Sequence, residues 1–149
     1  MERFGSMIVK VFSKVDFVNS LLSNHITDDN VEQSGQYFIC IDSTGGPRSA
    51  AYFEQSHNNV IRLVFDDVEE DAVMWGNDIQ AHYDAVAMTM PQAVDLYEFI
   101  KTIPKNSTIN IHCAKGQSRS VAVQSFLFDK EQGNPHVLRL LRQARELFN

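Results

Sequence analysis

The sequence predicts an α/β fold with a central, mainly parallel sheet flanked by helices. Short apolar runs of strand length alternate along the chain with segments whose apolar residues recur at helical spacing. Turn-forming residues separate these segments, and no internal repeat, linker or charge block divides the chain. We therefore expect residues 1–149 to form a single domain.

Four segments have the character of strands. The run 37–42, Tyr-Phe-Ile-Cys-Ile-Asp, is continuously apolar up to its last residue, which is typical of a strand buried on both faces. It stops at the turn residues 43–47, Ser-Thr-Gly-Gly-Pro. The predicted strands are Met7–Ser13, Tyr37–Asp42, Asn59–Phe65 and Thr108–His112.

Four helices are predicted, over Lys14–Leu22, Pro91–Ile103, Ser118–Lys130 and Pro135–Phe148. Ser13 is expected to be the N-cap of the first helix, and the spacing of Val15, Val18 and Leu22 predicts an apolar face. Thr89 is expected to cap the second helix, with Gln92 as its capping-box partner.

The last helix is predicted to be amphipathic. Its apolar face is formed by Val137, Leu138, Leu141, Ala144 and Leu147. This spacing leaves Arg139, Arg142 and Arg145 for a solvated face.

The segment Val68–Met90 shows no clear period. It mixes acidic residues with Trp75, Tyr83 and three methionines, and a short helix around residues 78–86 fits part of it. Two interpretations stay open, a packed surface excursion and a lid over a functional site, because long connections often carry function.

Composition and charge exclude several classes of function. With 44% hydrophobic and 21% charged residues, the chain has a globular composition and not that of a disordered tail. The net charge of −6 argues against nucleic acid or an anionic membrane as the main partner, because both need a basic patch. No run approaches the roughly 18 apolar residues of a membrane span, and no secretion signal is recognised. With only two cysteines, a cytoplasmic location is expected.

The stretch 111–120, Ile-His-Cys-Ala-Lys-Gly-Gln-Ser-Arg-Ser, is the most informative for chemistry. It leads from a predicted strand into a predicted helix, so its backbone N–H groups would form an anion-binding nest. Cys113 would feel that field, which lowers the pKa of a thiol. Arg119 can grip two oxygens of a phosphate, and Gly116 permits a backbone conformation that other residues resist. Cys113 alone would more often be a structural core residue, but the whole pattern predicts a phosphate-binding loop.

At His112, Cys113, Arg119 and Ser120 the sequence resembles the protein tyrosine phosphatase superfamily, whose signature is His-Cys, any five residues, Arg, then Ser or Thr. Chain length, motif position and the order of strands and helices also resemble the small dual-specificity-like phosphatases. The resemblance implies a dual-specificity-phosphatase-like fold. It also implies hydrolysis of phosphotyrosine, with phosphoserine and phosphothreonine as further candidates, in a phosphorylated protein or peptide partner.

The resemblance further implies a role for each residue of the motif. Cys113 would attack phosphorus and become a cysteinyl phosphate, while Ser120 would hydrogen-bond the sulfur and ease its departure. His112 would shape the loop and help to keep the cysteine ionised. No metal or cofactor is expected, because the loop and the arginine neutralise the phosphate. The residues implied to bind the substrate are Ala114, Lys115, Gly116, Gln117, Ser118 and Arg119.

The family supplies the leaving group with a proton from an aspartate that follows an earlier strand. Residues 65–67, Phe-Asp-Asp, resemble a run in small phosphatases whose second aspartate is the acid, so Asp67 is the expected donor. Asp66 and Asp71 stay as alternatives. The interval between Asp67 and Cys113 is longer than is usual for the family, and the excess matches the unplaced segment described above.

Two other functions stay open. The substrate could be a phosphoinositide, an RNA 5′-phosphate or a nucleotide, although relatives that act on such polyanions carry more basic loop residues than Lys115 alone. A phosphate-binding module without turnover would usually lack the nucleophile, the arginine or the acid, and none is evidently missing here.

Cys40 ends a predicted core strand, so inert packing is expected for it. Some relatives protect the catalytic cysteine by a reversible disulfide with a second cysteine on a neighbouring strand, so a Cys40–Cys113 disulfide stays an alternative. The other histidines show no spacing typical of metal ligands; they are His25, His57, His82 and His136.

Overall fold

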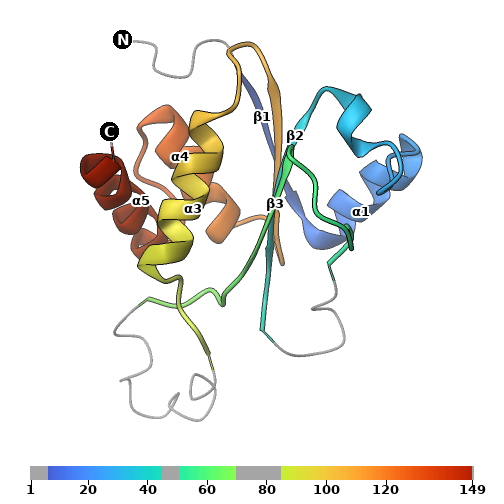
Figure 1. The fold of residues 1–149 in the computed structure, drawn as a ribbon. Helices are drawn as coiled ribbons and strands as arrows, with labels where there is room; N and C mark the ends of the chain where they lie inside the picture. Colours follow the sequence, from blue (N-terminus) through green and yellow to red (C-terminus); the bar gives the residue numbers. More distant parts are fainter. Residues whose placement is uncertain (1–6, 45–50, 70–84, 149) are drawn as a thin grey trace.

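The structure is a computed structural model that describes residues 7–44, 51–69 and 85–148. Its centre is a four-stranded sheet with the strand order β1-β4-β2-β3, and each of the three pairings is parallel (Figure 1). The predicted α/β fold with a parallel sheet is therefore confirmed. The predicted strand ends agree with the observed ones to within one residue; the strands are β1 (Ile8–Ser13), β2 (Tyr37–Asp42), β3 (Val60–Val64) and β4 (Thr108–Cys113).

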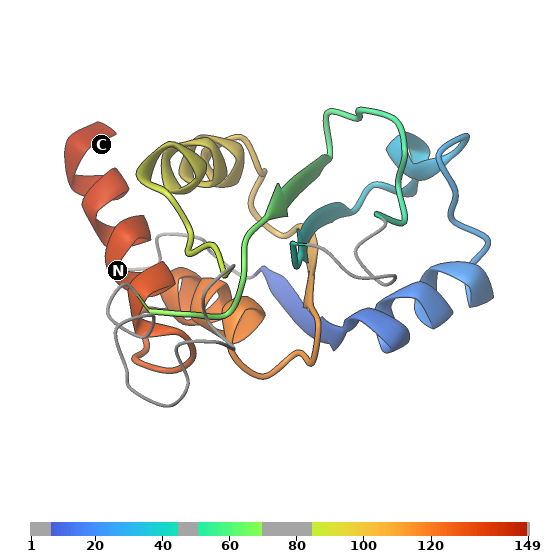
Figure 2. The same cartoon turned by 90° about the horizontal axis from the view of Figure 1, so that it is seen from below.

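Helices cover both faces of the sheet. In Figures 1 and 2, α1 and the short 3₁₀ helix η1 lie against one face, and α3, α4 and α5 lie against the other. The short helix η1 was not predicted, whereas the four longer helices all were. The helices are α1 (Lys14–Ser23), η1 (Val31–Ser34), α3 (Met90–Lys101), α4 (Arg119–Phe128) and α5 (Pro135–Phe148).

Strand β2 is apolar because both of its faces are buried. In β2, Ile39 and Ile41 belong to the larger core cluster beneath α3, α4 and α5. Phe38 and Cys40 alternate with them and belong to a smaller cluster with Phe17 of α1. This two-sided burial explains the uninterrupted apolar run in the sequence.

The buried face of α1 differs from the predicted one. Phe17 and Leu21 are buried, whereas Val15 and Leu22 are 59% and 57% exposed. Phe17 offers more apolar surface than a valine, and its ring packs edge-on against Phe38. The helix is therefore rotated so that its aromatic side chain faces the sheet.

The face predicted for α5 is largely correct. Val137, Leu138, Leu141 and Ala144 are buried, but Leu147 in the last turn is 67% exposed. The predicted helix caps are confirmed as well: the Ser13 hydroxyl accepts the Asp16 N–H at 3.1 Å, and Thr89 forms a capping box with Gln92. Such caps each contribute about 1 kcal/mol.

The predicted features of the Val68–Met90 segment fall largely outside the described residues, which include only 68–69 and 85–90 of it. Trp75, Tyr83 and most of the helix suggested around residues 78–86 lie outside them. None of the described helices is long and apolar enough to cross a membrane.

Candidate active site

The loop 114–118 joins β4 to α4 at the carboxyl edge of the sheet. Because the sheet is parallel, the carboxyl ends of β2 and β3 lie at the same edge. Open α/β sheets bind their ligands at this edge, where strands end and helices begin. The residues that follow β2 and β3 are thus placed to contribute to a site built around the loop.

Gly116 allows the loop to lie against the junction of β1 and α1. Its φ angle is +70°, in the left-handed region, and a Cβ atom there would lie 2.7 Å from the backbone nitrogen of Ser13. The Lys14 N–H also donates to the Ala114 carbonyl at 3.1 Å. Both the conformation and the space at position 116 therefore require glycine.

Cys113 is buried at the start of this loop and is held by hydrogen bonds. Its Sγ lies 3.1 Å from the Ser120 hydroxyl oxygen and 3.5 Å from the Ser120 nitrogen. Burial opposes ionisation of the thiol, but hydrogen bonds from the Ser120 hydroxyl and from the N–H groups of Ser120, Gly116 and Ser118 outweigh it. The pKa of Cys113 is therefore lowered from the ordinary value of 9.0, which favours a thiolate.

Arg119 is 4% exposed, and one nitrogen of its guanidinium is anchored. Its Nη1 donates to the Phe65 carbonyl at 2.7 Å and to the Ser43 hydroxyl at 3.0 Å, so residues after β2 and β3 orient the side chain. Its Nε is buried without a hydrogen-bond partner among the described residues. A buried charged donor without an acceptor is costly, and the edge that carries Nε therefore fits an anionic ligand.

His112 lies on the opposite side of the sheet from Cys113. Its ring packs against the Phe17 ring, with the centroids 4.3 Å apart. Burial lowers the pKa of His112 to about 3, and the positive charges of Lys14 and Arg119 act in the same direction. The ring is neutral at physiological pH, so any help that it gives to the Cys113 thiolate comes through loop geometry and not through positive charge.

The two neighbouring aspartates have different surroundings. Asp67 Oδ1 accepts hydrogen bonds from the Ser118 hydroxyl at 2.7 Å and from Asn134 Nδ2 at 2.8 Å, which places Asp67 against the loop. Asp66 accepts from the N–H and hydroxyl of Thr44 and from the Val86 N–H.

The hydrogen bonds of Asp66 thus stabilise the chain around Thr44 and Val86. Partial burial disfavours its charge, but its hydrogen bonds from Thr44 and Val86 prevail and lower the pKa of Asp66. A carboxyl group held as an anion is a poor proton donor. Asp67 is therefore the better placed of the two, and Asp71 lies outside the described residues.

Sequence reasoning missed Ser43 and Asn134. Ser43 stands in a run of turn residues and carries no sign that it contacts Arg119. Asn134 follows a glycine and precedes a proline, a pattern typical of a helix N-cap. That pattern predicts the start of α5 but not the contact between Asn134 and Asp67.

The geometry around Cys40 supports inert packing. Cys40 is the register partner of His112 and belongs to the smaller core cluster, whereas Cys113 belongs to the larger one. Successive side chains of a strand face opposite sides, so the two thiols lie on opposite faces of the sheet. Both cysteines are free, and burial together with the Asp42 carboxylate raises the pKa of Cys40.

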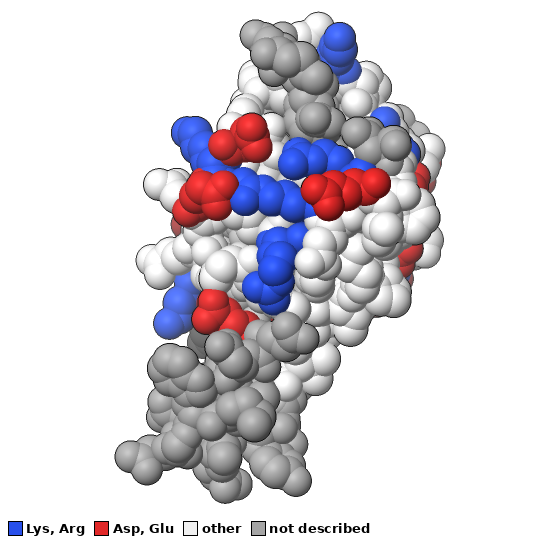
Figure 3. All heavy atoms as spheres, turned by 90° about the vertical axis from the view of Figure 1, so that its left-hand side faces the viewer, with Lys and Arg blue, Asp and Glu red and all other residues white. Residues whose placement is uncertain are grey.

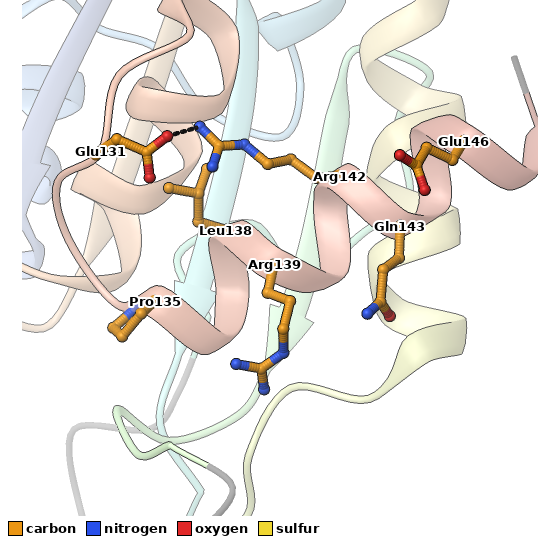
Figure 4. A pocket seen from close by; sticks show the side chains of 7 residues that line it. All are labelled: Glu131, Pro135, Leu138, Arg139, Arg142, Gln143 and Glu146. Atoms are coloured by element: carbon orange, nitrogen blue, oxygen red, sulfur yellow. Dashed lines mark ion pairs between the residues drawn. The ribbon is translucent and has the colours of Figure 1, made fainter.

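The outer surface of α5 carries mixed charges (Figure 3). Arg142 pairs with Glu131 at 2.7 Å across a surface pocket, and Arg139 points away from this pair (Figure 4). Arg145 lies over the Phe126 ring, 5.0 Å from its centroid. Arg139 is exposed as predicted, whereas Arg142 and Arg145 are half-buried. Because positive and negative side chains alternate, this face is not a uniformly basic surface.

Comparison with known proteins gave no relative. No protein-family model matches the chain, and no curated protein and no solved structure matches it. Within the described residues, no group of three or more His, Cys, Asp or Glu side chains is arranged to hold a metal ion.

Proposed function

We propose that this chain is a cysteine-dependent phosphatase that hydrolyses phosphotyrosine in proteins or peptides, with phosphoserine and phosphothreonine as further substrates. One observation carries the proposal. Among the described residues, the buried Arg119 has no hydrogen-bond partner at Nε, and it stands at the same loop as a buried cysteine whose pKa is lowered. An anion-binding group and a nucleophile at one helix N-terminus suit phosphoryl transfer.

In the first step, the Cys113 thiolate attacks the phosphorus atom of the bound ester. The new S–P bond forms as the P–O bond to the leaving group breaks, and protonated Asp67 gives its proton to the leaving oxygen. The contact between Asp67 and Ser118 supports this role, because it places the carboxyl group beside the loop. The products of this step are the free alcohol or phenol and a cysteinyl phosphate.

In the second step, water attacks the phosphorus atom and the S–P bond breaks. Asp67, now a carboxylate, accepts a proton from the water, and inorganic phosphate leaves. The Ser120 hydroxyl, 3.1 Å from Sγ, stabilises the departing thiolate. The side chain that protonates the first leaving group thus activates the second nucleophile.

Throughout both steps, the loop and Arg119 would hold the equatorial oxygens of the phosphoryl group. Ser43 and the Phe65 carbonyl fix Nη1, so the opposite edge of the guanidinium, formed by Nε and Nη2, is oriented before a substrate arrives. Preorganised donors of this kind supply most of the catalysis in phosphoryl transfer.

The proposal is tested by phosphate release from para-nitrophenyl phosphate and from phosphotyrosine, phosphoserine and phosphothreonine peptides. A phosphoinositide and an RNA 5′-phosphate complete the panel. We expect turnover of the phosphotyrosine peptide, its loss in Cys113→Ser, and its retention in the matched control Cys40→Ser. Absence of phosphate release from every substrate would contradict the proposal, and a strong preference for the lipid or the RNA end would replace the substrate class.

A further inference from the structure

Asn134 lies where α5 begins, and its amide group makes contacts in two directions. Its side-chain oxygen accepts the N–H groups of His136 at 2.9 Å and Val137 at 3.2 Å, and so caps the helix. Its Nδ2 donates to Asp67 Oδ1 at 2.8 Å and to the Val68 carbonyl at 3.3 Å. Because the oxygen faces the helix N–H groups, the amino group is directed toward Asp67.

The backbone of Asn134 is attached to the loop as well. Its N–H donates to the Ser118 carbonyl at 3.1 Å. The chain comes this close because Gly133 has a φ of +86° and no side chain; a Cβ there would lie 2.5 Å from the Ser118 oxygen. The Ser118 carbonyl thus accepts from the Asn134 N–H, and the Ser118 hydroxyl donates to Asp67. Each of these three residues hydrogen-bonds to the other two, so the loop, the start of α5 and the chain that follows β3 are joined at this point.

We propose that Asn134 is a positioning residue for proton transfer, acting through Asp67. Two donors, from Asn134 and Ser118, occupy Oδ1, so this oxygen is fixed against the loop and Oδ2 carries the transferable proton. The Asn134 side chain is 4% exposed and its contacts do not depend on a bound substrate. The inference rests on the proposed phosphatase function, and it adds a role for a residue outside the signature motif.

The variant Asn134→Ser separates the two contacts of this side chain. Serine provides an oxygen that caps α5, but it lacks the amide that donates to Asp67. We expect kcat for a phosphotyrosine peptide to fall by about 10- to 100-fold, as for other small misplacements of catalytic groups, with little change in KM. Turnover of 2,4-dinitrophenyl phosphate, whose leaving group departs without a proton, should stay within about twofold of wild type.

A double-mutant cycle makes the test independent of folding effects. In the Asp67→Asn background, Asn134→Ser should cause no further loss, because no proton donor is left to position. Thr89→Ala serves as the matched control, because it removes the cap of α3. We expect this variant to have a lower Tm but an unchanged ratio of kcat for the phosphotyrosine peptide to kcat for 2,4-dinitrophenyl phosphate. The inference would be overturned if wild type and Asn134→Ser had a similar ratio of kcat on the two substrates. It would also be overturned if the losses of kcat in the cycle were additive.

Failure of the proposed function has a different signature. Wild-type protein that turns over neither substrate would refute the phosphatase proposal itself. Turnover of both substrates with an unchanged ratio in Asn134→Ser refutes only the role of Asn134. Should Asn134→Ser fail to fold by thermal melting, Asn134→Thr also keeps a capping oxygen but lacks the amide, and the same ratio of turnover on the two substrates decides.

Discussion

Asp67 and Ser118 lie 51 residues apart in the sequence, yet the Ser118 hydroxyl donates to Asp67 Oδ1 at 2.7 Å. This contact joins the chain after β3 to the loop after β4. The neighbouring Asp66 makes its contacts with Thr44 and Val86 instead. The two adjacent carboxyl groups therefore have different surroundings: Asp67 contacts the loop that follows Cys113, and Asp66 stabilises the backbone around Thr44 and Val86.

The first prediction separates these two carboxyl groups. Asp67→Asn should slow turnover of a phosphotyrosine peptide by about 10²–10⁴-fold, because the amide cannot protonate the leaving oxygen. The basic limb of the pH–rate profile should flatten in the same variant. Asp66→Asn should show neither effect and instead lower the Tm, because it weakens the contacts with Thr44 and Val86. The opposite assignment follows if the two variants exchange these behaviours.

The second prediction concerns the fork of Arg119. Arg119→Lys should reduce turnover by about 10²–10³-fold, because an ammonium group cannot bind the Phe65 carbonyl and grip two phosphate oxygens together. Vanadate inhibition, measured in the same assay, should weaken too. Arg142→Lys is the matched control, since Arg142 pairs with Glu131 on the surface and should leave turnover unchanged. Near-normal turnover in Arg119→Lys would remove this residue from the site.

The third prediction tests the ionisation of Cys113. Hydrogen bonds from Ser120 and the loop N–H groups overcome the effect of burial and lower the thiol pKa. Ser120→Ala should therefore raise the pKa of Cys113 and slow its alkylation by iodoacetamide at mildly acidic pH. Ser125→Ala, which changes another buried serine of α4, should leave the alkylation profile in place. An unshifted profile in Ser120→Ala would show that this hydroxyl does not stabilise the thiolate.

The fourth prediction concerns stability and pH at His57. The hydrogen bond to Asp28 raises the pKa of His57 above the ordinary value of 6.5, against the effect of burial, and Glu32 adds to the rise. The stabilisation is complete below pH 6.5 and is lost as the pH rises through the native pKa. The free energy of unfolding in urea should therefore differ more between wild type and His57→Gln at pH 5.5 than at pH 8.5. A difference in unfolding free energy between wild type and His57→Gln that stays constant or grows as the pH rises would contradict a charged His57–Asp28 pair.

The sequence predicted the strands and the place of the loop between β4 and α4 well, because both depend on local patterns. An apolar run such as Tyr37–Asp42, followed by turn residues, fits few structures other than a buried strand. The loop between Cys113 and Arg119 is formed by residues that are close together in the sequence. The wrong face of α1 has a different cause. Val15 and Leu22 fit a helical stripe as well as Phe17 and Leu21 do, and periodicity alone cannot choose between two apolar stripes.

The contacts that complete the candidate site could not be predicted, because they join distant parts of the chain. Ser43 and the Phe65 carbonyl reach Arg119 from the ends of β2 and β3, and Asn134 reaches Asp67 from α5. Each of these residues has an ordinary local role as a turn residue, a strand end or a helix cap. Only the packing of the elements shows their second role.

The most direct test of the account is to trap the cysteinyl phosphate. Wild type and Ser120→Ala are mixed with a phosphotyrosine peptide, quenched in acid within milliseconds to seconds, and measured by intact-protein and peptide mass spectrometry. We predict one added phosphoryl group on Cys113, with more accumulation in Ser120→Ala because the thiolate departs more slowly without its hydroxyl donor. Phosphate release without any phosphoryl group on Cys113 at any quench time, or a phosphoryl group on another residue, would contradict the covalent cysteine mechanism.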